Sequence, residues 1–207
     1  MSFYSEAMLP FFMSRACGTE TYVELRKKIV PLATGKVLEV GMGSGANLSL
    51  YDPERVDFVW GLEPSQGMRK QARENVAQSP VEVRWLELPG EKISLDDCSV
   101  DTVLLTYTLC SIGDWRLALE QMYRVLKPGG KLLFCEHGIA PEPSVQKWQE
   151  RLTPAWKKMA GGCHLNRPIP SYLEEAGFVV DAMETFYMEN FPRIVGYIYL
   201  GQASKRS

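Results

Sequence analysis

The sequence predicts one α/β domain built on a doubly wound, mostly parallel sheet of seven strands. Short apolar runs alternate with helical patterns along most of the chain, which is typical of β-α-β units. The central runs are almost continuously apolar, as expected for strands that are covered on both faces. The last two runs are joined by a short turn, which predicts an antiparallel hairpin at one side of the sheet.

These patterns give the expected elements in chain order. Ser65 and Asp114 suit the N-termini of the first two helices, and Asn166 suits that of a later helix ending near Gly177, with Pro168 in its first turn. The expected strands span residues 36–41, 56–63, 81–87, 100–107, 131–137, 178–188 and 193–203, and the first two helices span residues 65–78 and 114–126. Residues 1–34 are expected to form a helical lid over a core of residues 35–203.

Length and composition narrow the class of protein. The 207 residues can bury a sizeable core, and a chain with 45% apolar and 23% charged residues is not expected to be disordered. A net charge of -2 offers no basic surface for nucleic acid. The five cysteines lack C-x-x-C spacing and follow no signal peptide, which predicts a reduced, cytoplasmic setting. The apolar run at residues 8–13 is too short to cross a membrane, so it is expected to belong to the lid or to touch a membrane surface peripherally.

A glycine-rich loop follows the first expected strand. Gly41, Gly43 and Gly45 leave room for backbone amides to approach a ligand closely. Such a loop also occurs in nicotinamide and flavin proteins, but here the third glycine follows the second by two residues rather than three. Glu39 precedes the first glycine, and Glu63 ends the second strand, where a carboxylate can accept both hydroxyls of a ribose.

The segments LEVGMGSGANL, GLEPS, PGEKISLDDCSVDTV and RVLKPGG, in this order, resemble the class I S-adenosylmethionine-dependent methyltransferases over residues 36–203. The resemblance implies the Rossmann-like methyltransferase fold, a catalytic core at residues 35–203 and S-adenosyl-L-methionine as cofactor. The cofactor-binding positions that it implies are Glu39, Gly41, Gly43, Glu63, Met68, Gly90, Glu91 and Thr106.

The resemblance also implies a part for each of these positions. Gly41 and Gly43 would bring backbone against the methionine part of the cofactor, and Glu39 would support that loop and the cofactor's amino group. Glu63 would hold the ribose hydroxyls and Met68 would pack on the adenine. Gly90 and Glu91 would contact the adenine edge. Thr106 would lie where backbone carbonyls meet the amino group of the cofactor.

Residues 108–178 are similar to one branch of this family, which includes the animal methyltransferase-like thiol S-methyltransferases. The residues that carry the similarity are Leu109, Cys110, Ser111, Glu136, His137, Trp148, Trp156, Gly162, Cys163, Leu165 and Arg167. Bacterial relatives of this branch are described as phospholipid or quinone methyltransferases. The animal members carry an N-terminal membrane anchor, and we expect none here.

The chemistry of the acceptor favours sulfur. A thiol with a pKa of about 8.5 is partly ionised near neutral pH, whereas a lipid amine with a pKa of about 10.4 needs a base or desolvation to become neutral. We therefore expect methyl transfer to a small thiol or sulfide. Transfer to a phospholipid amine or a quinone carbon is the alternative, and a non-catalytic cofactor-binding module or a nucleotide-dependent oxidoreductase is a more distant one. The oligomeric state is left open.

The candidate catalytic residue is His137, because it closes the fifth expected strand and ligands of such sheets bind beyond the carboxyl ends of the strands. Its alternative is a ring that shapes the pocket by donating to a backbone carbonyl. The candidate residues on the acceptor side are Tyr4, Cys163, His164 and Arg167. Arg167 would hold either its own loop or an anionic acceptor. No metal is expected, because the cysteines lack ligand spacing and Cys135 fits the core.

Overall fold

The computed structural model describes residues 20–205, so Tyr4, the apolar run at residues 8–13 and most of the expected lid lie outside the described residues. The elements are α2 (Glu20–Ile29), η2 (Val30–Leu32), β1 (Gly35–Val40), η3 (Leu48–Leu50), β2 (Val56–Leu62), α3 (Gln66–Ala77), β3 (Glu82–Leu86), β4 (Val100–Thr106), α4 (Trp115–Val125), β5 (Leu126–His137), α5 (Pro143–Met159), α6 (Ile169–Glu175), β6 (Phe178–Tyr187) and β7 (Tyr197–Lys205).

The strands form one seven-stranded sheet in the order β3-β2-β1-β4-β5-β7-β6. The first five strands of this order are parallel, and β7 runs antiparallel between β5 and β6. This confirms the doubly wound fold and the antiparallel C-terminal hairpin. The chain reverses its direction of travel across the sheet between β1 and β4, so a crevice is expected beyond the carboxyl ends of these two strands.

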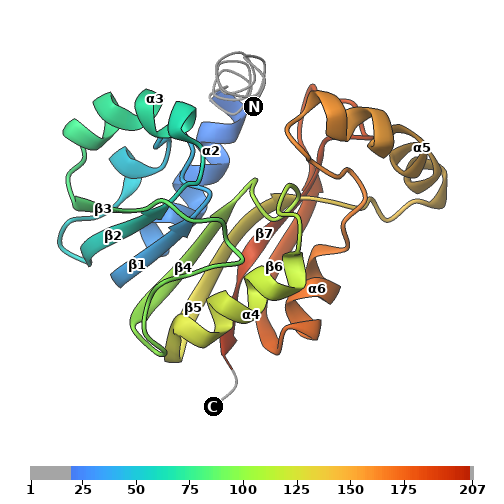
Figure 1. Ribbon diagram of the computed structural model, residues 1–207. Coiled ribbons are helices and arrows are strands. Elements are labelled where there is room, and N and C mark those ends of the chain that lie inside the picture. Colours follow the sequence, from blue (N-terminus) through green and yellow to red (C-terminus); the bar gives the residue numbers. More distant parts are fainter. Residues whose placement is uncertain (1–19, 206–207) are drawn as a thin grey trace.

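Helices cover both faces of the sheet, which divides the apolar interior into two clusters. Leu119 and Met122 of α4 pack with Ile169 of α6 in one cluster. Leu25 and Ile29 of α2 belong to the other, together with residues around α3. Figure 1 shows α4 and α6 side by side on one face, with α5 beyond the carboxyl end of β5. The helix at residues 20–29, part of the expected lid, therefore covers a sheet face.

The two expected N-caps are confirmed. The Ser65 hydroxyl accepts a hydrogen bond from the Met68 N–H, and the Asp114 carboxylate accepts one from the Leu117 N–H. The expected cap of α6 is wrong. The helix begins at Ile169 after Pro168, no side chain caps it, and Asn166 instead accepts a weak contact of 3.4 Å from the Thr153 hydroxyl.

Two strand boundaries also differ from the expectation, and in both places glycine or proline explains the difference. β5 starts at Leu126 rather than at residue 131, because its pairing with β4 shifts register across a segment that contains Gly129, whose φ is +76°. β7 starts at Tyr197 rather than at residue 193. Two successive backbone N–H groups, those of Val195 and Gly196, donate to the Pro192 carbonyl and hold the segment in a turn.

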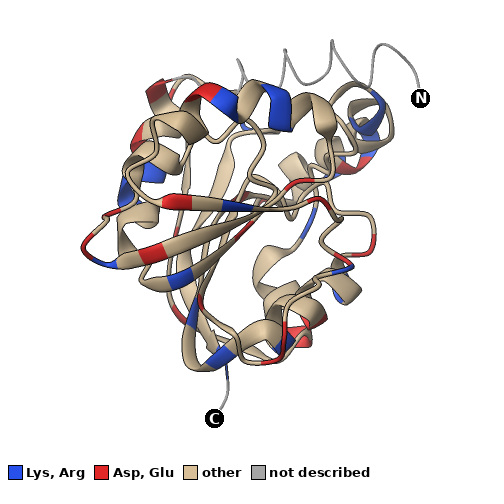
Figure 2. Ribbon diagram, turned by 60° about the vertical axis from the view of Figure 1, so that its left-hand side comes forward, with Lys and Arg blue, Asp and Glu red and all other residues tan. Residues whose placement is uncertain are grey.

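Basic and acidic residues are interspersed on the helices and turns seen in Figure 2. Within residues 20–205, none of the helices combines the length and the apolar character that crossing a membrane requires.

Candidate functional site

The glycine loop after β1 has a backbone that only glycine adopts easily. Gly41 and Gly43 have φ values of +72° and +60°. The N–H groups of Gly41 and Met42 both donate to the Leu62 carbonyl, which fixes the loop against the end of β2. A Cβ atom at Gly41 would lie 2.3 Å from the Thr108 side chain, so the loop passes between β1 and the segment after β4 with no room for a larger residue.

Glu63 lies directly after β2 and links this loop to the start of α3. Its carboxylate accepts the Gly43 N–H at 3.0 Å and the Ser65 N–H at 2.8 Å. Burial raises the pKa of Glu63, and the two N–H groups oppose that rise. Met68 packs toward the same loop, since a Cβ atom at Gly43 would lie 3.1 Å from its methyl group. The structure therefore brings Gly43, Glu63 and Met68 together at the switch point of the sheet.

Glu63→Ala is expected to weaken cofactor binding at least about tenfold, equivalent to about 1.4 kcal/mol. The substitution removes the carboxylate proposed to hold the ribose and also leaves the Gly43 and Ser65 N–H groups without their acceptor. Calorimetric titration with S-adenosylhomocysteine measures the loss. Glu54→Ala is the matched control, because Glu54 is an exposed acid just before the start of β2, at the opposite end of that strand from Glu63. An unchanged dissociation constant in Glu63→Ala would exclude the ribose role.

Glu39 belongs to a buried network beneath the glycine loop. Its two carboxylate oxygens accept from the Asn47 amide at 2.8 Å and from the Tyr51 hydroxyl at 2.7 Å. Arg26 of α2 donates to Asn47 and to the Thr106 hydroxyl, both at 2.7 Å. Burial raises the pKa of Glu39, while these neighbours favour its charged form. Glu39 and Thr106 thus share one hydrogen-bonded network. Its other members were not expected from the sequence, because the fold alone brings them together from separate elements.

Gly90 and Glu91 connect the loop after β3 to the start of α4. Glu91 accepts the Asp114 N–H at 3.1 Å. A Cβ atom at Gly90 would lie 3.5 Å from both Val40 and Ile112, so the glycine is packed beside the end of β1. Both residues therefore lie near the same end of the sheet as the glycine loop.

Two cysteines and a histidine that lie far apart in the sequence meet at the carboxyl ends of β4 and β5. Cys110 follows β4, His137 ends β5, and Cys163 lies in the turn after α5. Their ligand atoms all lie within 4.8 Å of one another, and His137 Nε2 is 2.9 Å from Cys163 Sγ. Both cysteines are buried. We call these three residues the Cys110–His137–Cys163 cluster.

The members of the cluster change each other's protonation. The pKa of Cys163 lies well below its ordinary value because the Cys110 thiol and the His137 ring both hydrogen-bond to its sulfur. Burial alone would lower the pKa of His137, but its contact with Cys163 raises it above the ordinary value. The pKa of Cys110 rises because of its hydrogen bond to Cys163 and its burial. The directions of these shifts favour the thiolate on Cys163 rather than on Cys110.

Glu136, the residue before His137, holds the backbone segment that carries Cys110. Its fully buried carboxylate accepts the N–H groups of Thr108 at 2.7 Å, Leu109 at 3.0 Å and Cys110 at 3.4 Å. Burial raises the pKa of Glu136 to about 7, against the effect of these three donors. Apart from the family similarity, no sequence signal marks this role, because an acid next to the end of an apolar strand has no visible partner in the sequence.

His164 and Arg167 bind the other side of the same segment. The His164 N–H donates to the Cys110 carbonyl at 2.9 Å, and the ring Nδ1 lies 3.1 Å from the same oxygen. The guanidinium of Arg167, which is only 4% exposed, donates to the carbonyls of Leu109 and Ile112. These contacts are of the kind expected from the first of the two roles considered for Arg167, that of holding its loop.

The other described cysteines stay apart from the cluster. Cys135 is buried in β5, as its apolar neighbours in the sequence predict, and its sulfur lies 3.1 Å from the Tyr107 hydroxyl. Cys98 is exposed. The sequence spacing indicated no metal-ligand set, but the fold brings Cys110, His137 and Cys163 to one point. The expectation of no metal rested on ligand spacing within the sequence, whereas these three residues come from separate segments.

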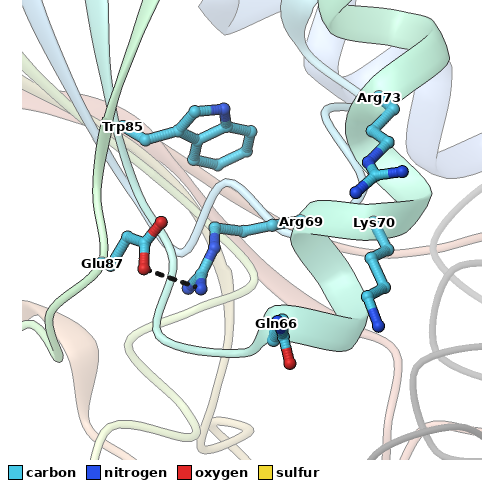
Figure 3. A pocket seen from close by; sticks show the side chains of 6 residues that line it. All are labelled: Gln66, Arg69, Lys70, Arg73, Trp85 and Glu87. Carbon is cyan, nitrogen blue, oxygen red and sulfur yellow. Dashed lines mark hydrogen bonds and ion pairs between the residues drawn. The ribbon is translucent and has the colours of Figure 1, made fainter.

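A pocket of about 220 Å³ lies outside this region, between α3 and β3 (Figure 3). Arg69 pairs with Glu87 at 3.0 Å and also donates to the Glu63 carbonyl, so its guanidinium is committed to the protein itself. The residues that line the pocket are Gln66, Arg69, Lys70, Arg73, Trp85 and Glu87. The pocket therefore flanks the Glu63 segment without containing the expected site residues.

The sequence and the fold are similar to those of known proteins. A family model described as "Methyltransferase domain" matches residues 38–134. Human "Thiol S-methyltransferase TMT1B" is 38% identical over 158 residues, which are 73% of this chain and 64% of that protein. A "Demethylmenaquinone methyltransferase" of Clavibacter sepedonicus is 25% identical over 74% of this chain and 62% of its own length. The solved structure of a SAM-dependent methyltransferase from Thermotoga maritima superposes with a TM-score of 0.68, at 18% identity and with 98% of each chain covered.

The chain belongs to the class I S-adenosylmethionine-dependent methyltransferases. It spans less than two thirds of the length of the human thiol S-methyltransferase that it matches.

The residues of this class I methyltransferase fit S-adenosyl-L-methionine as the cofactor. Gly41 and Gly43 form a cradle of backbone in which a Cβ atom would meet Thr108 or Met68. The Glu63 carboxylate keeps acceptor capacity beyond its two N–H partners, as a ribose diol requires.

Proposed function

We propose that this methyltransferase transfers a methyl group from S-adenosyl-L-methionine to a small thiol or to sulfide. The observation that carries the proposal is the Cys110–His137–Cys163 cluster, whose two cysteines are buried. It lies at the carboxyl ends of β4 and β5, the same edge of the sheet at which the cofactor loop follows β1. The name of the human relative, a thiol S-methyltransferase at 38% identity, supports the same acceptor.

The cofactor would be held by the residues around the switch point. Gly41 and Gly43 bring backbone to its methionine part, and Glu63 binds the ribose. Met68, Gly90 and Glu91 surround the adenine, while Glu39 and Thr106 support the loop from below. When bound, the cofactor supplies a methyl group on a positively charged sulfur. The protein's own task is then to position the acceptor and exclude water.

His137 is the proposed catalytic residue, the one through which the site keeps the acceptor sulfur deprotonated. The ring already lies 2.9 Å from the sulfur of Cys163, a contact that supports its placement beside an acceptor sulfur. Because a thiol is more acidic than an amine, a single imidazole suffices for sulfur where a lipid amine would need a stronger base. Cys163 and His164 would form the wall of the acceptor pocket, and the fixed position of Arg167 would keep that wall in place.

Labelled methyl groups are expected to appear in thioethers when the protein is given labelled cofactor and a panel of acceptors. The panel contains ethanethiol, sodium sulfide, phosphatidylethanolamine vesicles and demethylmenaquinone, and mass spectrometry of each product locates the label. Label in the quinone or the lipid, with none in either sulfur compound, would overturn the proposal. The quinone belongs in the panel because the relative from Clavibacter sepedonicus is named for that substrate.

The same assay tests His137. His137→Ala is expected to lower the turnover number at least about 100-fold, the lower end of what general acid–base groups contribute, and to leave the affinity for S-adenosylhomocysteine unchanged. Cys98→Ser is the matched control, because Cys98 is exposed and lies outside the site. Equal losses of turnover and cofactor affinity would make His137 a structural residue.

A further inference from the structure

We propose that Cys110, His137 and Cys163 are three ligands of a zinc ion, and that the acceptor thiol binds at the fourth position of that ion. This inference rests on the thiol methylation proposed above and assigns the way in which the same site holds its acceptor.

The kinds of atom in the cluster are those that zinc prefers. Two cysteine sulfurs and one imidazole nitrogen form a three-ligand set of the type found in zinc sites that keep an open position. Bonds of about 2.3 Å to sulfur and about 2.0 Å to nitrogen, in tetrahedral geometry, place the ligand atoms roughly 3.5–3.8 Å apart. In the structure these atoms lie within 4.8 Å of one another, and His137 Nε2 is 2.9 Å from Cys163 Sγ. Shifts of about 1 Å or less therefore form the site.

The charges around the cluster suit a divalent cation. Two thiolates in contact would repel each other in a buried site, and one Zn²⁺ cancels both. The nearest buried ionisable side chains, Glu136 and Arg167, are already hydrogen-bonded to backbone groups of the segment that carries Cys110, so the cluster itself has to be neutralised from within. Two thiolates, a neutral imidazole and Zn²⁺ together have no net charge.

The protein holds the two segments that carry the cysteine ligands from behind, as a metal site requires. Glu136 fixes the N–H groups on the segment that carries Cys110, and the His164 N–H joins the Cys163 turn to the Cys110 carbonyl. The other nitrogen of the His137 ring, Nδ1, is buried and has no hydrogen-bond partner within residues 20–205. The described contacts therefore leave the ring able to carry its proton on Nδ1 and to offer Nε2 to a metal.

In this arrangement His137 acts on the acceptor through the zinc ion rather than as a free base, and preparing the acceptor needs no redox step. Three protein ligands leave one tetrahedral position, and a thiol R–SH that binds there gives up its proton to solvent as its sulfur forms the bond to zinc. The bound sulfur keeps lone pairs for the new bond to carbon. A soft acceptor is thereby selected over an amine or a quinone carbon.

Cobalt substitution of the full chain tests the site directly, without an activity measurement. The protein is stripped of metal with a chelator in a phosphine reductant, and Co²⁺ is then titrated in. One Co²⁺ per chain is expected, with a thiolate-to-cobalt charge-transfer band and the intense visible bands of a tetrahedral ion. Cys110→Ser and Cys163→Ser should each weaken Zn²⁺ binding, measured against a chromophoric chelator, at least about 100-fold, beyond the range for outer-shell changes. Cys98→Ser should leave it unchanged.

Added ethanethiol is expected to shift the visible bands of the cobalt protein, because its sulfur enters the fourth position. The absence of a thiolate-to-cobalt band in the wild-type protein would overturn the metal site, and this result does not depend on whether the serine variants fold. Bands that ethanethiol leaves unchanged would overturn the acceptor position. Either failure is separate from that of the proposed function, since the panel of acceptors is assayed independently and decides whether thiols are methylated.

Discussion

Replacing Glu136 with alanine is expected to lower the free energy of unfolding by at least about 3 kcal/mol, since each buried donor left unsatisfied costs about 1–3 kcal/mol. The carboxylate is fully buried and accepts three successive backbone N–H groups, those of Thr108, Leu109 and Cys110. Alanine offers none of these donors an acceptor. Urea unfolding followed by circular dichroism measures the loss.

Two further variants make the result specific. Glu91→Ala removes a carboxylate that accepts a single N–H, from Asp114, at a half-buried position, so its loss should stay below about 1 kcal/mol, the typical net value of one hydrogen bond. Glu136→Gln keeps one acceptor oxygen and should fall between the two. A loss in Glu136→Ala no larger than that in Glu91→Ala would show that other contacts hold the segment after β4.

Gly41→Ala is expected to weaken the binding of S-adenosylhomocysteine at least about 100-fold, equivalent to about 2.7 kcal/mol. A residue other than glycine in this left-handed conformation costs about 1–2 kcal/mol. In addition, the new Cβ would lie 2.3 Å from Thr108, so either the glycine loop or the segment after β4 has to move. Calorimetric titration gives the affinity, and a thermal melt shows whether the fold survives.

Gly129→Ala separates the two causes. Gly129 has a φ of +76°, close to the +72° of Gly41, but a Cβ atom there meets nothing within 4 Å. This control therefore carries the backbone cost without the collision, and it should lose stability while keeping cofactor affinity. If Gly41→Ala bound as tightly as Gly129→Ala, the contact with Thr108 would not control the shape of the loop.

The sequence was sufficient to predict the sheet and the glycine loop after its first strand, because the apolar runs are long and the loop falls between two of them. The sequence did not predict the starts of β5 and β7, where Gly129 and Pro192 alter the backbone locally. The capping roles of Ser65 and Asp114 followed from local patterns, since a cap involves residues three positions apart. The start of α6 could not be predicted in that way, because no side chain caps it.

The candidate site was predicted unevenly for a related reason. His137 could be found from its place at the end of a strand, and the glycine loop from its spacing. Cys110 and Cys163 are joined only by the packing of the turn after α5 onto the segment after β4, which no pattern in the sequence reports. Arg167 reads as a possible anion ligand in the sequence, and only its burial against two carbonyls shows that it is a support.

The position of β7 between β5 and β6 governs the order in which the molecule can assemble. While the chain is being synthesised, β5 has a partner in β4 but presents an open edge until β6 and β7 have both emerged, and open edges invite pairing with other chains. His137 acquires its neighbour Ile198 only when β7 enters that gap. The glycine loop and Glu63 belong to strands that can pair much earlier. The half of the site that holds the nucleotide can thus form before the half that holds the acceptor, which is completed by a contact between distant parts of the chain.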